Sequence, residues 1–223
     1  MPLWPEIKGL KFPDEYVVRF FFKEQMDKKQ ARVLELGCGN GNNLMLFHEY
    51  GWSVFGIDIN PGSLANADHN FSIIDEAKRG GYAFLQHDLS RALPKVEGKY
   101  DVVLMPGVLE YIPRNAMKKC LMDVSNLLVP GGYFFLRMRA LGDYRYGKGR
   151  MVELNGFILE IAETGEEGLL NVFYHPDEIV KILHDHLSVD KNSLRMFNLS
   201  FDNWQNNTQI ATNQEFIIWG KVQ

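Results

Sequence analysis

Residues 33–43 constrain the fold of this chain more than any other stretch. They read VLELGCGNGNN, an apolar segment followed by glycines at alternate positions. The apolar segment is typical of a parallel strand that is covered on both faces. Glycine permits positive φ and lets a ligand approach the backbone closely, and the amides and dipole of a following helix favour a negative group. The stretch therefore predicts a buried strand, a cofactor-binding turn and the start of a helix.

The spacing of the glycines restricts the kind of cofactor. Dinucleotide-binding turns carry glycines at relative positions one, three and six. Gly37 and Gly39 fill the first two positions, but Asn42 fills the third, which argues against a nicotinamide-dependent dehydrogenase. Residues 54–58 read as a second strand that ends in Asp58. Asp58 lies about 20 residues past the turn, the spacing expected of a carboxylate that accepts hydrogen bonds from ribose hydroxyls.

The pattern Glu-x-Gly-x-Gly-x-Gly over residues 35–41, followed by Asp58, resembles the first motif and the ribose-binding acid of class I S-adenosylmethionine-dependent methyltransferases. The resemblance is strong over residues 31–138 and loose elsewhere, and is closest to small bacterial members with unassigned substrates. It implies one α/β domain over residues 1–223, with a Rossmann-like, seven-stranded, mostly parallel sheet, helices on both faces and an antiparallel last strand. It also implies S-adenosylmethionine as methyl donor and S-adenosylhomocysteine as product.

The resemblance further implies a set of cofactor-binding residues near the carboxyl ends of the strands. Asp88, after the predicted third strand, would accept a hydrogen bond from the adenine amine, and Leu89 would pack against the ring. A capping role for Asp88 is the alternative. The full set is Glu35, Gly37, Cys38, Gly39, Asn43, Asp58, Ile59, His87, Asp88, Leu89, Met105 and Pro106.

In methyl transfer the leaving group is a neutral thioether, so the enzyme must align the reactants and exclude water. An acceptor that reacts through an N–H or O–H group must also lose a proton. His175, Tyr111 and Tyr146 are the candidate bases, but each is equally suited to a structural role. Many relatives carry His where Tyr111 stands. Residues 105–108 read MPGV rather than the Asn-Pro-Pro-Tyr or Asp-Pro-Pro-Tyr of amino-methylating DNA and protein enzymes.

Two variable segments are expected to complete the active site. Residues 1–30 form a predicted N-terminal helical cap, with Asp14 capping a helix to about Lys28. Residues 141–173 form an insert whose length indicates a functional or disordered connection, and we expect it to fold over the active site. Its candidate substrate contacts are Tyr144, Arg145 and Tyr146.

Arg145, Lys148 and Arg150 in this insert favour an anionic acceptor such as a carboxylate or a phosphate. A solvated basic turn is the alternative. The predicted function is methyl transfer to an oxygen or nitrogen of a small molecule. The alternatives are an RNA or protein methyltransferase and a non-catalytic S-adenosylmethionine-binding protein.

The bulk composition bears on partners and location. The chain has 223 residues and a net charge of −4, so it lacks the basic excess of a typical nucleic-acid binder. It contains two cysteines, Cys38 and Cys120, whose predicted places make a disulfide between them unlikely to form, which fits a reducing, cytoplasmic location. Neither an apolar run of membrane-spanning length nor a metal-ligand cluster is evident. The sequence does not specify the oligomeric state.

Overall fold

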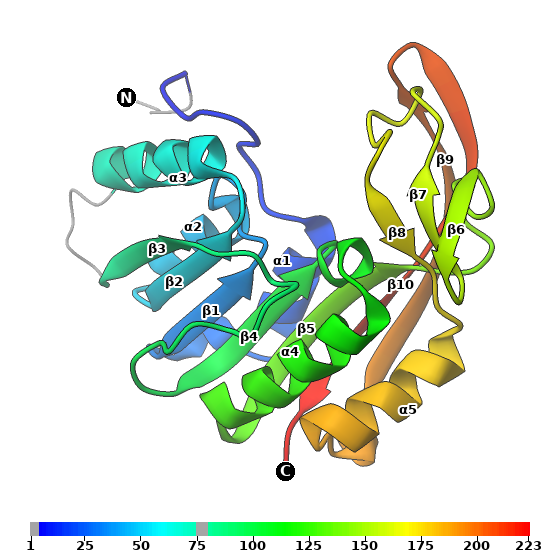
Figure 1. The fold of residues 1–223 in the computed structure, drawn as a ribbon. Coiled ribbons are helices and arrows are strands. Elements are labelled where there is room, and N and C mark those ends of the chain that lie inside the picture. The colour runs from blue at the N-terminus through cyan, green and yellow to red at the C-terminus, as the bar shows by residue number, and fades with distance from the viewer. Residues whose placement is uncertain (1–4, 75–79) are drawn as a thin grey trace.

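The structure is a computed structural model that describes residues 5–74 and 80–223. Its main sheet has seven strands in the order β3-β2-β1-β4-β5-β10-β9 (Figure 1). The strands are β1 (Arg32–Leu36), β2 (Ser53–Asp58), β3 (Tyr82–Gln86), β4 (Tyr100–Pro106), β5 (Leu128–Arg139), β9 (Arg195–Gln205) and β10 (Thr208–Lys221). β10 runs antiparallel to both β5 and β9. The expected mostly parallel sheet with an antiparallel last strand is confirmed.

Helices cover both faces of this sheet, as expected. One face carries α1 (Glu15–Lys23), α2 (Asn42–Glu49) and α3 (Pro61–Ile74), and the other carries α4 (Arg114–Leu127) and α5 (Pro176–Leu187). Each face has its own hydrophobic core, because alternate residues of a strand point to opposite sides. On β1, Val33 belongs to the α1–α3 side, and Leu34 and Leu36 belong to the α4–α5 side.

The N-terminal helix is shorter than predicted. Asp14 caps α1 as expected, with its carboxylate accepting from the amides of Tyr16 and Val17. α1 ends at Lys23 instead of about Lys28 because Gln25 adopts a left-handed conformation with φ 56°. A separate 3₁₀ turn, η1 (Met26–Lys28), follows. The predicted end of α3 at Gly80–Gly81 follows residues 75–79, which lie outside the described residues.

The insert between β5 and α5 forms a small antiparallel sheet of its own. It comprises β6 (Gly149–Glu153), β7 (Gly156–Leu159) and β8 (Leu170–Val172). Figure 1 shows this small sheet beside the far ends of β9 and β10, past the carboxyl ends of the parallel strands. It is therefore placed next to the edge where parallel sheets bind ligands.

The last two strands are longer than the predicted segments at 194–201 and 214–222. They meet at Asn206 and Asn207, which have φ of 47° and 60°. Asparagine tolerates this left-handed backbone better than most residues, so the pair supports a tight hairpin. The hairpin extends beyond the main sheet toward the insert (Figure 1).

Across residues 5–74 and 80–223, no helix is long and apolar enough to cross a membrane. In the same residues, no group of three or more His, Cys, Asp or Glu side chains is arranged to hold a metal ion. Cys38 and Cys120 are buried, free thiols that belong to the cores on opposite faces of the sheet.

Candidate cofactor and active site

The glycine-rich turn between β1 and α2 is held against the end of β2. Gly37, Gly39 and Gly41 all have positive φ, of 73°, 51° and 78°, which explains the alternating glycines. The amides of Gly37 and Cys38 donate to the carbonyl of Ile57. These two amides are therefore used within the fold.

Glu35 lies under this turn, at the end of β1. It is only 1% exposed, and its Oε1 accepts a hydrogen bond from Asn43 Nδ2 at 2.6 Å. Asn43 Oδ1 in turn accepts from the amide of Asp14 at 2.8 Å, which links β1, α2 and the N-terminal segment. Burial raises the pKa of Glu35 to about 8. Its other oxygen, Oε2, has no hydrogen-bond partner among the described residues.

Asp58 holds the turn from the end of β2. Its Oδ2 accepts from the amide of Gly39 at 2.8 Å, and its Oδ1 accepts from the amide of Asn60 at 2.8 Å. A carboxylate oxygen has two acceptor sites, so these bonds leave acceptor capacity toward the adjoining cavity.

That cavity, the first pocket, has a volume of about 490 Å³ and a largely apolar lining. Leu89 is buried at its floor, and Ile59 is exposed at its rim. Leu169 and Leu170 reach it from the insert. The lining is Gly37, Asp58, Ile59, His87, Asp88, Leu89, Ser90, Gly107, Val108, Tyr111, Ile112, Leu169 and Leu170. An apolar slot flanked by carboxylates suits a ring that carries amine and hydroxyl donors.

Asp88 has the capping interaction that was the alternative to adenine binding. Its Oδ1 accepts from the amide of Ser90 at 2.9 Å, and Arg91 lies 3.7 Å from Oδ2. Hydrogen bonds from Ser90 lower the pKa of Asp88, so the group is an ionised acceptor at the cavity wall. His87 turns its Nε2 to the carbonyl of Ala92 at 2.9 Å, although the residue also lines the first pocket.

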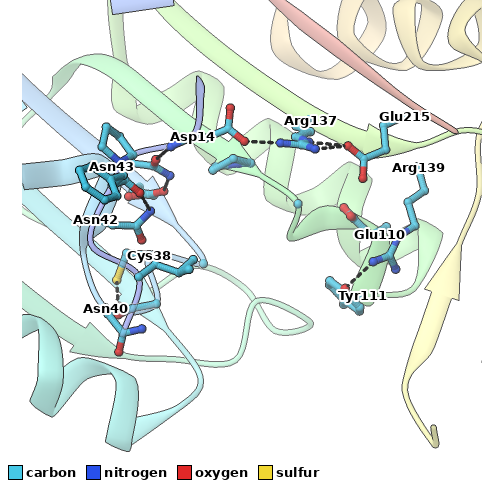
Figure 2. A pocket seen from close by; sticks show the side chains of 18 residues that line it. Asp14, Cys38, Asn40, Asn42, Asn43, Glu110, Tyr111, Arg137, Arg139 and Glu215 are labelled. Carbon is cyan, nitrogen blue, oxygen red and sulfur yellow. Dashed lines mark hydrogen bonds and ion pairs between the residues drawn. The ribbon is translucent and has the colours of Figure 1, made fainter. Parts of the chain in front are cut away.

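A second pocket of about 410 Å³ adjoins the first and is strongly polar. Figure 2 shows Asp14 and Asn43 on one side of it, with Arg137 and Glu215 across from them. Its lining is Leu10, Phe12, Pro13, Asp14, Glu35, Gly37, Cys38, Gly39, Asn40, Asn42, Asn43, Pro106, Gly107, Glu110, Tyr111, Arg137, Arg139 and Glu215. Both arginines are engaged: Arg137 pairs with Asp14 and Glu215.

Arg139 binds a group of residues at the far side of the second pocket. It pairs with Glu166 of the insert at 2.7 Å, donates to Tyr111 Oη at 2.9 Å and donates to Asn171 Oδ1. Tyr111 Oη also donates to Glu166. Burial by itself raises the pKa of Glu166, but Arg139, the hydrogen bond from Tyr111 and Arg145 together lower it. These bonds fasten the insert to the end of β5.

Three residues line both pockets: Gly37, Gly107 and Tyr111. They mark where an elongated ligand would pass from the apolar pocket to the polar pocket. Gly107 and Tyr111 belong to the segment after β4, which includes the 3₁₀ turn η3 (Leu109–Tyr111). Of the three candidate bases, Tyr111 is therefore the one at the junction, and burial raises its pKa.

His175 and Tyr146 do not face either pocket. His175 caps α5, with Nδ1 accepting from the amide of Asp177 at 3.3 Å. Tyr146 donates to Asn155 Oδ1 at 2.9 Å and packs edge-on against Phe157 and Phe173. In the structure both side chains serve the insert and its junction with α5, and a catalytic role for either stays a prediction.

The predicted substrate contacts Tyr144 and Arg145 also lie outside both pocket linings. Tyr144 donates to Glu163 at 2.8 Å, with the Lys148 ammonium over its ring. Arg145 is 2% exposed and pairs with Asp143 at 3.1 Å and with Glu166. Arg145 is thus buried in the insert and Lys148 stacks on a tyrosine, so Arg150 is the exposed member of the three cations on which the anionic-acceptor prediction rested.

Met105 is also misplaced in the predicted cofactor set. Its side chain is fully buried in the core on the α4–α5 face and lines neither pocket. Strand alternation explains this, because Met105 shares the face of Val103 and points away from Leu104. The neighbouring Pro106 lines the second pocket. The other predicted cofactor residues line one pocket or both.

Sequence reasoning missed part of the polar pocket. Arg137, Arg139 and Glu215 come from β5 and β10, where Glu215 is paired in register with Arg139. The sequence feature that could have indicated these residues is the pair of arginines at alternate positions at the end of an apolar central strand. Glu110 was considered only as one of several polar groups near the mouth.

The family model described as a methyltransferase domain matches residues 33–132. A trans-aconitate 2-methyltransferase from Methylobacterium nodulans is 32% identical over 139 residues, covering 60% of this chain and 49% of that protein. A human tRNA N(3)-cytidine methyltransferase is 28% identical over 137 residues, covering 57% of this chain and 35% of that protein. The chain thus spans half or less of the length of these relatives.

The fold is shared with solved methyltransferase structures. An S-adenosylmethionine-dependent methyltransferase from Methanosarcina mazei superimposes with a TM-score of 0.69 at 21% identity, covering 95% of this chain and 99% of that one. The matched domain contains the glycine turn, the acid after β2 and the segment after β4 that line the two pockets. Residues 33–132 thus form a methyltransferase domain of the class I, S-adenosylmethionine-dependent type.

Proposed function

We propose that the protein binds S-adenosylmethionine across its two pockets and transfers the methyl group to an oxygen or nitrogen of a small molecule. The observation that carries the proposal is the junction at Gly37, Gly107 and Tyr111, which connects an apolar pocket to a polar one. The adenosine moiety fits the first pocket, and the methionine moiety fits the second. The sulfonium lies between these moieties in the donor, and therefore at the junction.

The residues at each end suit the groups they would bind. Asp58 and Asp88 supply carboxylate acceptors for ribose hydroxyls and the adenine amine, and Leu89 and Ile59 flank the ring. In the second pocket, Glu35, Asn43 and Asp14 form a polar wall for the amino-acid end. The volumes of both pockets lie within the range of ligand sites. The protein's part in the reaction is to align donor and acceptor and to keep water out.

A small acceptor fits the enclosure better than a macromolecule does. The insert reaches the first pocket through Leu169 and Leu170 and binds Tyr111 through Glu166. The space left beside the junction is thus bounded by the insert on one side and the N-terminal segment on the other. The reducing environment suited to two free thiols supports a cytoplasmic location, which we include in the proposal.

Calorimetry with purified protein tests the donor assignment. S-adenosylmethionine and S-adenosylhomocysteine should both bind, and nicotinamide dinucleotides should not. Asp58→Ala should weaken binding by about 1.5–3 kcal/mol per lost charged hydrogen bond. Because Asp58 also holds the Gly39 amide, Asp58→Asn serves as the control that keeps the turn's shape. Unchanged affinity in Asp58→Ala would exclude Asp58 from the ribose site.

The human relative's name favours RNA as the second candidate acceptor. The net charge of −4 argues against it, because nucleic-acid binding depends on cations that release counterions from phosphates. Mobility-shift measurements with tRNA at physiological salt should show only weak binding. A metabolite extract should instead yield a compound that gains one methyl group when protein and donor are added.

A further inference from the structure

Glu110 is a buried carboxyl that no structural role accounts for. It belongs to η3, is 3% exposed and lines the second pocket. Its Oε2 is buried and has no hydrogen-bond partner within the part of the chain that the structure describes. A buried, unpaired acceptor is costly, so its retention beside a ligand cavity points to a ligand group that pairs with it.

The position of Glu110 relative to the junction identifies that ligand group. Its Oε1 lies 3.8 Å from where a side-chain carbon on Gly107 would stand, and its chain neighbour is Tyr111. Gly107 and Tyr111 both border the junction of the two pockets. Figure 2 shows Glu110 between the Arg137–Glu215 pair and the Arg139–Tyr111 pair. The carboxyl is therefore beside the point where the donor's sulfonium would lie.

The surrounding charges leave Glu110 available for this role. Arg139 directs its two terminal nitrogens to Glu166, Tyr111 and Asn171, and its buried Nε makes no hydrogen bond to Glu110. Two further carboxylates, Glu215 on β10 and Glu166 on the insert, disfavour the ionised form of Glu110. The hydroxyl of Tyr174, at the start of α5, is also electrostatically coupled to it. Burial is the largest influence on the pKa of Glu110 and, against the field of Arg139, raises it to about 7.

We propose that Glu110 is the counter-ion of the donor's sulfonium and the acceptor of the proton that the methyl acceptor loses. This inference rests on the proposed binding of S-adenosylmethionine. The sulfonium cation stabilises the Glu110 carboxylate while the donor is bound. When the methyl group leaves, that cation disappears, and the carboxylate in its apolar surroundings becomes a base.

The step balances in atoms and charge. The acceptor's lone pair forms the new bond to the methyl carbon, and the carbon–sulfur bond breaks with its electrons remaining on sulfur. The proton on the acceptor atom passes to Glu110 Oε2. The pocket begins with a sulfonium and a carboxylate and ends with a thioether and a carboxylic acid, so its net charge is unchanged.

The class of acceptor follows from this proton. An acceptor that is already an anion, such as a carboxylate, has no proton to give and would itself be repelled by Glu110. An amine or a hydroxyl has one and is neutral when it reacts. Glu110 thus restricts the small-molecule acceptor to compounds with a reactive N–H or O–H group.

Proton linkage to donor binding tests the role of Glu110 without knowledge of the acceptor. Calorimetric titrations at pH 7 in two buffers of different ionisation enthalpy measure protons released on binding. S-adenosylmethionine should displace about half a proton more than S-adenosylhomocysteine, because a group with a pKa near the working pH is half protonated before binding. The affinity ratio of donor to product should also rise about tenfold between pH 6 and pH 8, because the ionised fraction of a group with a pKa near 7 rises about tenfold over this range.

Glu110→Gln should remove the difference in proton release and make the donor-to-product affinity ratio independent of pH. Binding of S-adenosylhomocysteine should persist in this variant. Protons exchanged by the ligands themselves remain in this variant and are subtracted. Glu35→Gln is the comparison variant, because Glu35 is the other buried carboxyl of the pocket with a raised pKa. Both ligands present the same amino-acid end to Glu35, so this variant should weaken both alike and leave the difference between them in place.

Three results separate the outcomes. Equal proton release for the two ligands in the unmodified protein overturns the role of Glu110, even if Glu110→Gln fails to fold. A difference lost in Glu35→Gln instead transfers the linkage to Glu35 and also overturns it. If neither ligand binds the unmodified protein, the proposed function itself fails.

Discussion

At the scale of single residues, the ligand-binding edge of the sheet combines two buried carboxyls with two arginines. Glu35 and Glu110 each retain an oxygen without a partner among residues 5–74 and 80–223. Arg137 and Arg139 each bind carboxylates of other elements. The arginines stabilise the architecture of the pocket, and the carboxyls are the groups that remain available for ligand chemistry.

Glu35 should make the stability of the ligand-free protein depend on pH. Its pKa is raised from 4.5 to about 8 on folding, so the folded state binds more protons than the unfolded state between these values. The free energy of unfolding should therefore fall as pH rises from 4.5 to 8. Glu35→Gln should reduce this pH-dependent fall in the free energy of unfolding by a few kcal/mol, since one pKa unit corresponds to about 1.4 kcal/mol.

Urea unfolding of both proteins at pH 5 and pH 8 measures this effect. The variant should gain stability relative to the unmodified protein at pH 8 and show little difference at pH 5. Parallel pH profiles for the two proteins would assign the dependence to another group, of which Glu110 is the first to examine.

The residue-level predictions succeeded where backbone geometry determines the residue type. The positive φ values of Gly37, Gly39 and Gly41 favour glycine strongly, so the turn could be predicted from the sequence. Arg145 was misread because a charged side chain in a polar segment was expected to reach solvent or substrate. Its burial depends on Asp143, which is two residues away, and on Glu166, which is 21 residues away, and the pairing with Glu166 leaves no periodic signal in the sequence.

At the scale of elements, the insert is attached to two other parts of the fold. Arg145 donates to Gln205 and Asn213 of the β9–β10 hairpin, and Glu166 binds Arg139 at the end of β5. The insert therefore behaves as an extension of the main sheet. The parallel core was predictable from its apolar strands, but the strands of the insert were not, because β6 has no buried face.

A turn signal for the insert was nevertheless present. Leu154 and Asn155 connect β6 to β7, Asn155 has φ 54°, and Gly156 begins β7. Asn-Gly is a strong indicator of a tight hairpin when strands flank it. The hairpin was missed because the flanking residues carry no regular alternation of polar and apolar side chains.

Arg145→Ala should destabilise the protein by about 3–5 kcal/mol, the cost of leaving buried charges unpaired. Asp143 and Glu166 would lose their shared cation, while the first pocket's carboxylates remain in place. Arg150→Ala is the control, because Arg150 is exposed in the same insert and should change stability by no more than about 0.5 kcal/mol. Chemical denaturation with and without S-adenosylhomocysteine provides both values, and equal stability of the two variants would refute the anchoring role of Arg145.

At the scale of the whole molecule, the two pockets are covered by different parts of the chain. The insert covers the first pocket through Leu169 and Leu170, and the N-terminal segment covers the second through Leu10, Phe12 and Pro13. Leu10 and Phe12 are 68% and 67% exposed. The insert is fixed by buried ion pairs. The N-terminal segment is held by hydrogen bonds to α2 and α3 and by the Asp14–Arg137 ion pair, and it also presents exposed apolar side chains to the pocket.

Limited trypsin digestion should distinguish these two covers. Cleavage at Lys11 should slow when S-adenosylhomocysteine is added, because bound ligand orders the segment that lines its pocket. Cleavage at Lys148 and Arg150 should change little, because the insert is already anchored. Equal protection at all three positions would indicate that the insert also closes on the ligand.

The fixed insert has a consequence for the route by which the donor is renewed. The insert covers the proposed adenosine end and is fixed by buried ion pairs, whereas the exposed side chains of Leu10 and Phe12 flank the proposed amino-acid end, so the two ends of the ligand should have unequal freedom to depart. The spent cofactor should then leave with its amino-acid tail first and its nucleoside last. Release of the nucleoside from beneath Leu169 and Leu170 would limit the rate of turnover. Shortening these two side chains would speed the exchange of spent cofactor for fresh donor without altering the chemical step.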